Sequence, residues 1–231
     1  MPALLAANRM HATAGRRARI VAGYAALAAV VFAAGFVLAP SPEGVSGPRW
    51  QGPRSWLARP VSIGPFTLDV AGEGAGSFTR ERLVGHWTLM YFGYSRCPDV
   101  CHPAIEALAR VAAGLTAGAR GVRVERVFVT VDPERDTPTR LREYLSRSDA
   151  GILAVHGSER RVAELARRAG ILYTRRTRDS RGGYLVDHPA AILLIDPQAR
   201  VRAGFLPPHD AERIVEEIVE MEPAFADEAA R

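Results

Sequence analysis

Residues 87–101 read WTLMYFGYSRCPDVC, and this stretch places a buried strand directly before a pair of cysteines. Residues 87–94 are a short apolar and aromatic run, which is typical of a strand inside a sheet. Apolar side chains then recur at helical spacing over residues 104–115, which predicts a helix after the cysteines. Pro98 suits the first position of that helix, so we expect Cys97 near its N-cap and Cys101 one turn inside it.

Strands and helices continue to alternate along the chain. Residues 122–131 predict a second buried strand, and Thr137-Pro138 is a good start for the next helix. Further strands are expected at 63–70 (an edge strand), 152–155, 184–186, 191–195 and 201–206, and further helices at about 158–169 and 210–221. The alternation predicts an α/β fold in which helices flank a mixed sheet, with an antiparallel pair late in the chain.

The first sixty residues predict a membrane anchor and a tether. Residues 20–39 are uncharged and mostly apolar, and a helix of about 20 residues spans the ~30 Å core of a bilayer. The flanking arginines all lie in residues 1–19, so this basic tail should stay in the cytoplasm and the rest should be exported. Residues 40–60 hold five prolines and three glycines and indicate a linker. A cleaved signal peptide is the alternative, although its apolar run usually has only about 7–15 residues.

The remaining chain predicts one domain over residues 61–222, followed by a C-terminal tail at 223–231. Hydrophobic residues make up 48% of the sequence, enough for a packed core. The formal net charge is +5, but residues 40–231 hold 26 basic and 25 acidic groups and are nearly neutral. A domain without a basic stripe is a poor phosphate binder, so we expect no nucleic-acid partner.

Cys97 and Cys101 are the only cysteines in the chain. On an ideal helix, a spacing of four residues separates Cα atoms by about 6 Å, within reach of a disulfide. The pair therefore suits an inert disulfide, a reactive dithiol or a two-sulfur metal clamp. The inert disulfide is the weaker interpretation, because closing so small a loop adds little stability. A c-type haem attachment site is a weaker interpretation still. Its usual motif has two residues between the cysteines, whereas three residues separate Cys97 and Cys101.

Three blocks of the sequence together resemble the Sco/SenC family. They are FGYSRCPDVC at 92–101, VFVTVDPERDTP at 127–138 and YLVDHPAAILLID at 184–196, and the resemblance covers roughly residues 60–222. Members of this family are membrane-anchored, thioredoxin-like copper proteins that assist assembly of the copper A centre in cytochrome c oxidase. The resemblance implies a thioredoxin-like sheet and places the copper ligands on Cys97, Cys101 and His188. His102 and Pro189 depart from the family pattern without removing a ligand.

The residue types agree with a copper site. Thiolate sulfur prefers Cu(I) and imidazole serves Cu(I) or Cu(II), whereas zinc normally takes a fourth ligand. Cys97 and Asp132 each follow a predicted parallel strand, and His188 precedes an antiparallel one, so all three should meet at one edge of the sheet. His102 is a weaker candidate for a fourth ligand, because neighbouring residues on a helix point about 100° apart.

Asp132 and Asp136 allow two interpretations. They belong to a strand end and a helix start, where Asp136 or Thr137 serves as an N-cap. Alternatively, either carboxylate orients a ligand or the loop that carries it.

Two functions fit these residues. In the first, the protein is a metallochaperone rather than an enzyme: it holds copper and passes it to the copper A subunit of cytochrome c oxidase. A second periplasmic copper chaperone would be a further partner, and the protein would be a single-pass protein of the cytoplasmic (inner) membrane with its domain on the periplasmic side. In the second, it is a thiol–disulfide reductase that keeps partner cysteines reduced, with Cys97 as the nucleophile and Cys97–Cys101 as the redox pair. A peroxidase is less suitable, since the chain has no separate resolving cysteine.

Pro189 carries a further prediction. A cis-proline commonly precedes the strand that faces the active cysteines in thioredoxin-like folds, and Pro189 lies just before an apolar strand. We therefore expect the His188–Pro189 bond to be cis.

Overall fold

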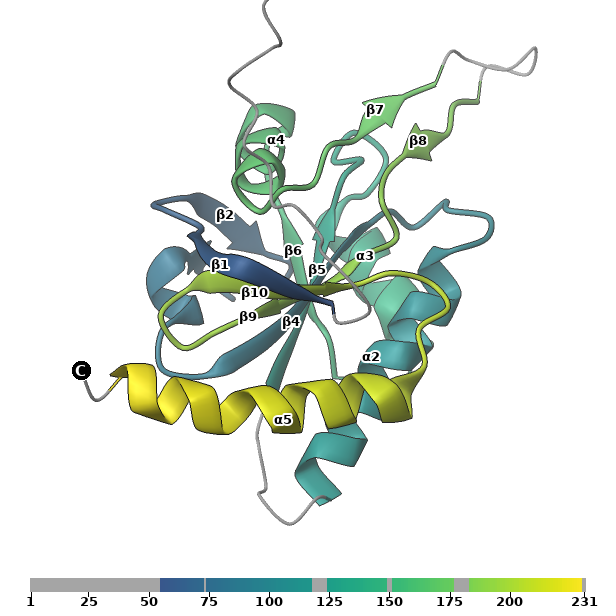
Figure 1. Ribbon diagram of the computed structural model, residues 1–231. Helices are drawn as coiled ribbons and strands as arrows, with labels where there is room; N and C mark the ends of the chain where they lie inside the picture. Colours follow the sequence, from purple (N-terminus) through teal and green to yellow (C-terminus); the bar gives the residue numbers. More distant parts are fainter. Residues whose placement is uncertain (1–54, 73, 118–123, 149–150, 177–182, 230–231) are drawn as a thin grey trace, which may run out of the picture. The chain divides into compact units, whose positions relative to one another are not determined.

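The computed structural model describes residues 55–72, 74–117, 124–148, 151–176 and 183–229 (Figure 1). The predicted basic tail and membrane anchor, and the linker up to residue 54, lie outside these residues. Within the described part of the chain, no helix combines the length and the apolar character that crossing a bilayer requires.

A mixed sheet of eight strands forms the centre of the fold, in the order β1-β10-β9-β4-β5-β6-β2-β3. The strands are β1 (Trp56–Ser62), β2 (Thr67–Val70), β3 (Ser77–Thr79), β4 (Trp87–Gly93), β5 (Val124–Thr130), β6 (Leu153–His156), β9 (Ile192–Ile195) and β10 (Arg200–Phe205). β4, β5 and β6 are parallel, and β9 pairs antiparallel with β4. The predicted α/β fold with a mixed sheet is confirmed. The expected edge strand at 63–70 is shorter and is not at the edge, because β2 lies between β6 and β3.

β1 begins inside the stretch at 40–60 that the sequence predicts as linker. It pairs with β10, and the register shifts between Trp56 and Val61, where Pro60 interrupts the ladder. Just before the strand, the Ser55 amide donates to the Glu217 carboxylate at 3.0 Å and the Ser55 carbonyl accepts from Gly204 at 2.9 Å. The sheet therefore begins before residue 61, because an edge strand tolerates a proline that donates no ladder hydrogen bond.

Helices cover both faces of the sheet (Figure 1). They are α2 (Cys101–Ala117), α3 (Pro138–Leu145), α4 (Glu159–Arg168) and α5 (Ala211–Ala229), with a short 3-10 helix η1 (Arg80–Leu83). α2, α3 and α5 form one core with Leu89 and Tyr91 of β4, whereas α4 packs in a second core with Met90 and Phe92 of the same strand. Successive β4 side chains thus alternate between the two cores. α5 continues past the predicted end at residue 221, so most of the predicted tail at 223–231 is helical.

The register brings three loops to one edge of the sheet. Gly93 pairs with Thr130 where the parallel strands β4 and β5 end, and the antiparallel strand β9 begins at Ile192 opposite Tyr91. The segments that follow β4 and β5 and the segment that precedes β9 therefore leave the sheet together, as the sequence predicts. A two-stranded sheet of β7 (Thr174–Arg175) and β8 (Val186–Asp187) projects nearby.

The His188–Pro189 bond is trans, so the prediction of a cis bond is wrong. Within the described residues, the cis peptide bond is Pro207–Pro208. A trans bond before proline is favoured by about 0.5–1 kcal/mol unless the fold opposes it. β9 starts only at Ile192, so Pro189 lies outside the ladder and the bond before it has the commoner trans form.

Candidate metal centre

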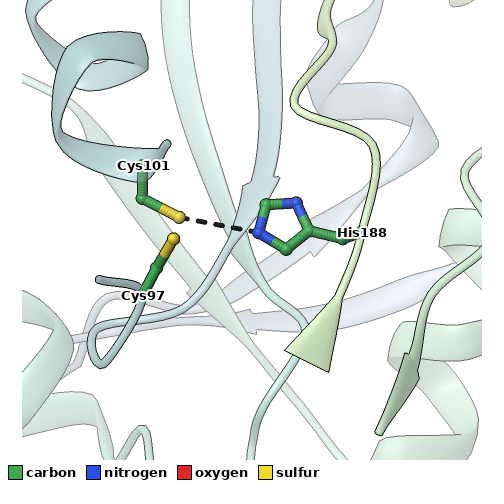
Figure 2. A group of neighbouring side chains, drawn as sticks. All are labelled: Cys97, Cys101 and His188. Atoms are coloured by element: carbon green, nitrogen blue, oxygen red, sulfur yellow. Dashed lines mark hydrogen bonds between the residues drawn. The ribbon is translucent and has the colours of Figure 1, made fainter. Parts of the chain in front are cut away.

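Cys97, Cys101 and His188 bring three potential metal ligands together at this edge, as Figure 2 shows. The two Sγ atoms and an imidazole nitrogen all lie within 4.8 Å of one another. The Sγ of Cys101 is 3.6 Å from Nε2 of His188. Both cysteines are free thiols. The structure thus joins the three residues that the sequence singles out, and their spacing allows one ion to contact all three.

The loop before α2 sets the positions of the two cysteines. The Cys97 amide donates to the Tyr94 carbonyl at 3.2 Å, which closes a turn, and the Ala104 amide donates to the Val100 carbonyl at 3.4 Å. α2 therefore begins at Cys101, and the prediction that it begins at Pro98 is wrong. Because of this turn, Cys97 is partly exposed in the loop, whereas Cys101 is fully buried at the first residue of the helix.

The two thiols differ strongly in acidity. The pKa of Cys97 falls to about 4, mainly because the Cys101 thiol donates a hydrogen bond to its sulfur. His188 and the backbone N–H groups of Asp99 and Cys101 add to this effect and outweigh burial. The pKa of Cys101 rises, because it donates that hydrogen bond and because it is buried. The negative charge of the pair therefore lies on Cys97, the more accessible sulfur.

His188 is oriented with Nε2 toward the sulfurs. Its Nδ1 lies 3.2 Å from the Pro189 carbonyl oxygen, which can only accept a hydrogen bond. When Nδ1 carries the hydrogen of the neutral ring, Nε2 keeps its lone pair for a metal; in the metal-free chain a hydrogen on Nε2 instead lets the ring donate to the Cys97 sulfur. The rings of Tyr91 and Tyr94 contact the imidazole edge-on, with centroids 6.0 Å and 5.8 Å away. No separate signal in the sequence singles out these tyrosines, although both belong to the YFGY run before the cysteines.

Asp136 contacts the cysteine loop but none of the three ligands. It accepts hydrogen bonds from the Ser95 amide at 3.0 Å, from the Ser95 hydroxyl, and from the Thr130 hydroxyl at 2.7 Å. These bonds tie the residue two positions before Cys97 to the end of β5. The N-cap of α3 is Thr137, whose side chain accepts from the Arg140 amide.

Asp132 contacts the histidine segment instead. Its fully buried carboxylate accepts a hydrogen bond from the Tyr184 hydroxyl at 2.6 Å and pairs with Nε of Arg135. Asp136 thus contacts the loop that carries the cysteines, and Asp132 contacts the segment that carries His188. Arg135 and Tyr184 were not among the predicted site residues, because only the tertiary fold brings them together.

His102 lies apart from the other ligands. Its side chain is 68% exposed, and its ring lies 3.2 Å from the Glu106 carboxylate on the same helix. In the described part of the chain, the group of potential ligands has three members and His102 is not among them. The donor set fits an ion that accepts three soft or borderline ligands better than it fits zinc.

The site is open to another molecule on its histidine side. A shallow hollow there is lined by Leu172, Thr174, Asp187, His188 and Pro189, among others. Together with the partial exposure of Cys97, this hollow lets an incoming ligand approach from solvent.

Comparison with known proteins gives consistent matches. The sequence pattern of the SCO1/SenC family matches residues 58–222. The chain is 32% identical over 165 residues to the mouse (Mus musculus) "Protein SCO2 homolog, mitochondrial", covering 71% of this chain and 65% of that protein. It is 32% identical over 164 residues to "Protein SCO1, mitochondrial" of Saccharomyces cerevisiae, covering 70% of this chain and 54% of that protein. The chain thus spans about half to two thirds of the length of these mitochondrial relatives.

Solved structures agree with the sequence matches. The crystal structure of Arabidopsis thaliana ScoI with copper bound has a TM-score of 0.64 and 29% identity, covering 70% of this chain and 98% of that one. Yeast Sco1 with copper bound has a TM-score of 0.63 and 31% identity, covering 70% of this chain and 88% of that one.

Proposed function

Because this chain belongs to the SCO1/SenC family, we propose that it binds a copper ion through Cys97, Cys101 and His188 and delivers it to the copper A centre of cytochrome c oxidase. The observation that supports this most directly is the convergence of two thiols and one imidazole within 4.8 Å. Copper is the metal named for the solved relatives from Arabidopsis and yeast.

The chemistry of the three donors favours a transferable copper ion. Two sulfurs suit Cu(I), and the imidazole adds a ligand that either oxidation state accepts. Cys97 ionises easily and is partly exposed, so a thiol of the recipient can replace it as a ligand without opening the buried Cys101 side. Release then proceeds by stepwise exchange of ligands between the two proteins.

We further propose that the domain works on the periplasmic side of the cytoplasmic membrane, next to the copper A subunit. The apolar run at 20–39 and the arginines before it support this location. A second periplasmic copper chaperone would supply the ion. Protease added to spheroplasts should digest the domain if this orientation is right, and protection of the domain would overturn it.

An anaerobic Cu(I) titration of the 231-residue chain against a chelator tests the ligand set. We expect one copper per chain, weaker binding after Cys97→Ser or Cys101→Ser, and loss of one nitrogen ligand after His188→Ala. His102→Ala is the matched control, because this exposed histidine lies outside the group. Wild-type Cu(I) affinity of Cys97→Ser, or an unchanged number of nitrogen ligands in the X-ray absorption spectrum of His188→Ala, would show that the proposed ligand set is wrong.

The same two cysteines support a second candidate function, thiol–disulfide reduction. The partly exposed Cys97 thiolate is placed to attack a partner disulfide, which releases one partner thiolate and forms a mixed disulfide. Cys101 then loses its proton and attacks Cys97, so the second partner thiolate leaves and this chain keeps a Cys97–Cys101 disulfide. His188 forms and breaks no bond in these steps and only helps to keep Cys97 ionised. A His188→Ala chain that still reduces an oxidised partner but cannot load it with copper would therefore separate the two functions.

A further inference from the structure

Tyr184 is held at two points by residues that follow β5. Its hydroxyl donates a hydrogen bond of 2.6 Å to the Asp132 carboxylate, and its carbonyl accepts one of 2.8 Å from Nη1 of Arg135. The Asp132 side chain is fully buried, and Nε of Arg135 pairs with it. Each of the three residues thus contacts the other two, and the buried carboxylate is satisfied only while the unit is intact.

The aromatic ring of Tyr184 adds a third contact. The Arg135 guanidinium carbon lies 3.6 Å from the ring centroid, a close cation–π arrangement. Burial and the neighbouring Asp132 carboxylate raise the pKa of Tyr184 to about 12. The hydroxyl therefore remains a hydrogen-bond donor throughout the physiological pH range.

The chain between Tyr184 and His188 contacts both the loop after β4 and the β7 segment, where the Arg176 amide donates to the Leu185 carbonyl at 2.8 Å and Arg176 pairs with Asp187. The Val186 amide donates to the Tyr94 hydroxyl at 3.3 Å, and the Tyr94 ring contacts the imidazole of His188 edge-on. By itself, the pairing of β7 with β8 has two residues on each strand, and such a ribbon is marginally stable alone. The position of His188 consequently depends on contacts with the loops after β4 and β5.

We infer that Tyr184, clamped by Asp132 and Arg135, is a positioning residue that sets the location of His188 relative to the two cysteines. This inference rests on the proposed function, in which His188 is a copper ligand. The cysteine loop has its own connection to the end of β5, through Asp136 and Ser95, in addition to the contact of Tyr94 with Arg135, whose guanidinium carbon lies 5.7 Å from the Tyr94 ring centroid. Opening the clamp should therefore release the imidazole and leave the two-sulfur part of the site in place.

The difference between Cu(I) and Cu(II) makes this inference testable. Two thiolates suffice to hold Cu(I), whereas Cu(II) depends more on the imidazole. In the 231-residue chain, Tyr184→Phe should weaken Cu(II) binding about tenfold, the lower end of the loss found when a partner of a metal ligand is removed, because Tyr184 acts on His188 through the intervening chain. It should also shift the thiolate-to-Cu(II) absorption band toward that of His188→Ala, while the Cu(I) affinity stays as in the wild type.

Tyr173→Phe is the matched control. Tyr173 lies just before β7, and within the described residues its buried hydroxyl has no hydrogen-bond partner. Removing that hydroxyl should change neither the Cu(II) band nor the Cu(II) affinity. Arg135→Lys is a second variant, which keeps the charge but loses the planar contact with the Tyr184 ring and carbonyl, and it should act as Tyr184→Phe does.

Amide hydrogen exchange in the metal-free chain supplies a readout that does not depend on copper. Tyr184→Phe should speed exchange at Val186 and leave Cys101 and the rest of α2 unchanged. If His188→Ala alters the Cu(II) band but Tyr184→Phe and Arg135→Lys do not, the positioning role is refuted and the proposed function stands. If His188→Ala itself leaves the Cu(II) band unchanged, the proposed ligand set is wrong and the inference fails with it.

Discussion

A methyl group added at Gly93 should disturb the metal site from inside the fold. Gly93 is the last residue of β4, and a Cβ atom there would lie 2.8 Å from Cε1 of Tyr91 and 2.9 Å from Sγ of Cys101. Cε2 of Phe128, in the next strand, would be 3.0 Å away. The backbone at this position is ordinary extended strand, so the whole effect of Gly93→Ala comes from lack of space.

The size of the effect follows from these distances. Comfortable contacts of a Cβ atom begin at 3.4 Å, so at least one ring and the Cys101 sulfur have to move by roughly half an ångström. Overpacking of this kind costs about 1–3 kcal/mol. For a domain of this size, each kcal/mol lowers Tm by about 2–4 °C, which predicts a fall of ~2–12 °C. The displaced sulfur should also alter the thiolate-to-Cu(II) absorption band.

Thermal unfolding and copper absorption of Gly93→Ala test this reasoning, with Gly114→Ala as the control. A Cβ at Gly114 would meet Cγ2 of Val215 at 2.9 Å, between α2 and α5 and away from the copper ligands. The gain in helix propensity of about 1 kcal/mol offsets part of that contact. Gly114→Ala should therefore have a small effect on Tm and none on the copper band. A Gly93→Ala protein with wild-type Tm and band would refute the reasoning.

Three further predictions concern single side chains. Asp136→Asn should lower the free energy of unfolding by about 3 kcal/mol in urea, because the buried carboxylate accepts charge-assisted bonds from Ser95; a loss below about 1 kcal/mol would contradict this. In the metal-free chain at about pH 6, iodoacetamide should modify Cys97 and spare Cys101, because the Cys97 pKa is about 4 while that of the buried Cys101 is raised; equal labelling by mass spectrometry would contradict this. Burial lowers the pKa of His209 below its usual 6.5. The neutral form of His209 should therefore contribute its full share of the free energy of unfolding above about pH 6.5, and this contribution should be lost as the pH falls below that value. His209→Gln should reduce that loss in pH-dependent unfolding, and an unchanged slope would count against it.

The sheet could be predicted because its central strands carry their own signal. The parallel strand β4 is buried along its whole length and reads as a nearly continuous apolar run, and the second half of the neighbouring parallel strand β5 is buried in the same way. β1 could not be predicted this way, because Arg59 and Pro60 break the apolar pattern and only pairing with β10 makes the segment a strand. Local propensity also misplaced the start of α2, since the turn from Tyr94 to Cys97 overrides the preference of Pro98 for a helix start.

The candidate site also has a part that the sequence reveals and a part that only the folded chain reveals. Two cysteines at a strand-to-helix junction, and a histidine before an apolar strand, are visible in the sequence, and family resemblance groups them. Arg135 and Tyr184 are 49 residues apart, and their contact exists only in the folded chain. A pattern search sees each of them as an ordinary surface residue, because nothing local indicates the partner.

The position of β1 also determines which fragments of this protein remain soluble. β1 covers the outer side of β10, and Arg59 and Pro60 give the sheet a charged, irregular border that resists pairing with another chain. A fragment that starts at residue 61 would make β10 the border instead. Most of β10 is buried in the intact domain, including Val201, Ala203 and Phe205, and its amide and carbonyl groups would then face solvent. Such a fragment should self-associate, whereas one that starts at or before Ser55 should remain monomeric.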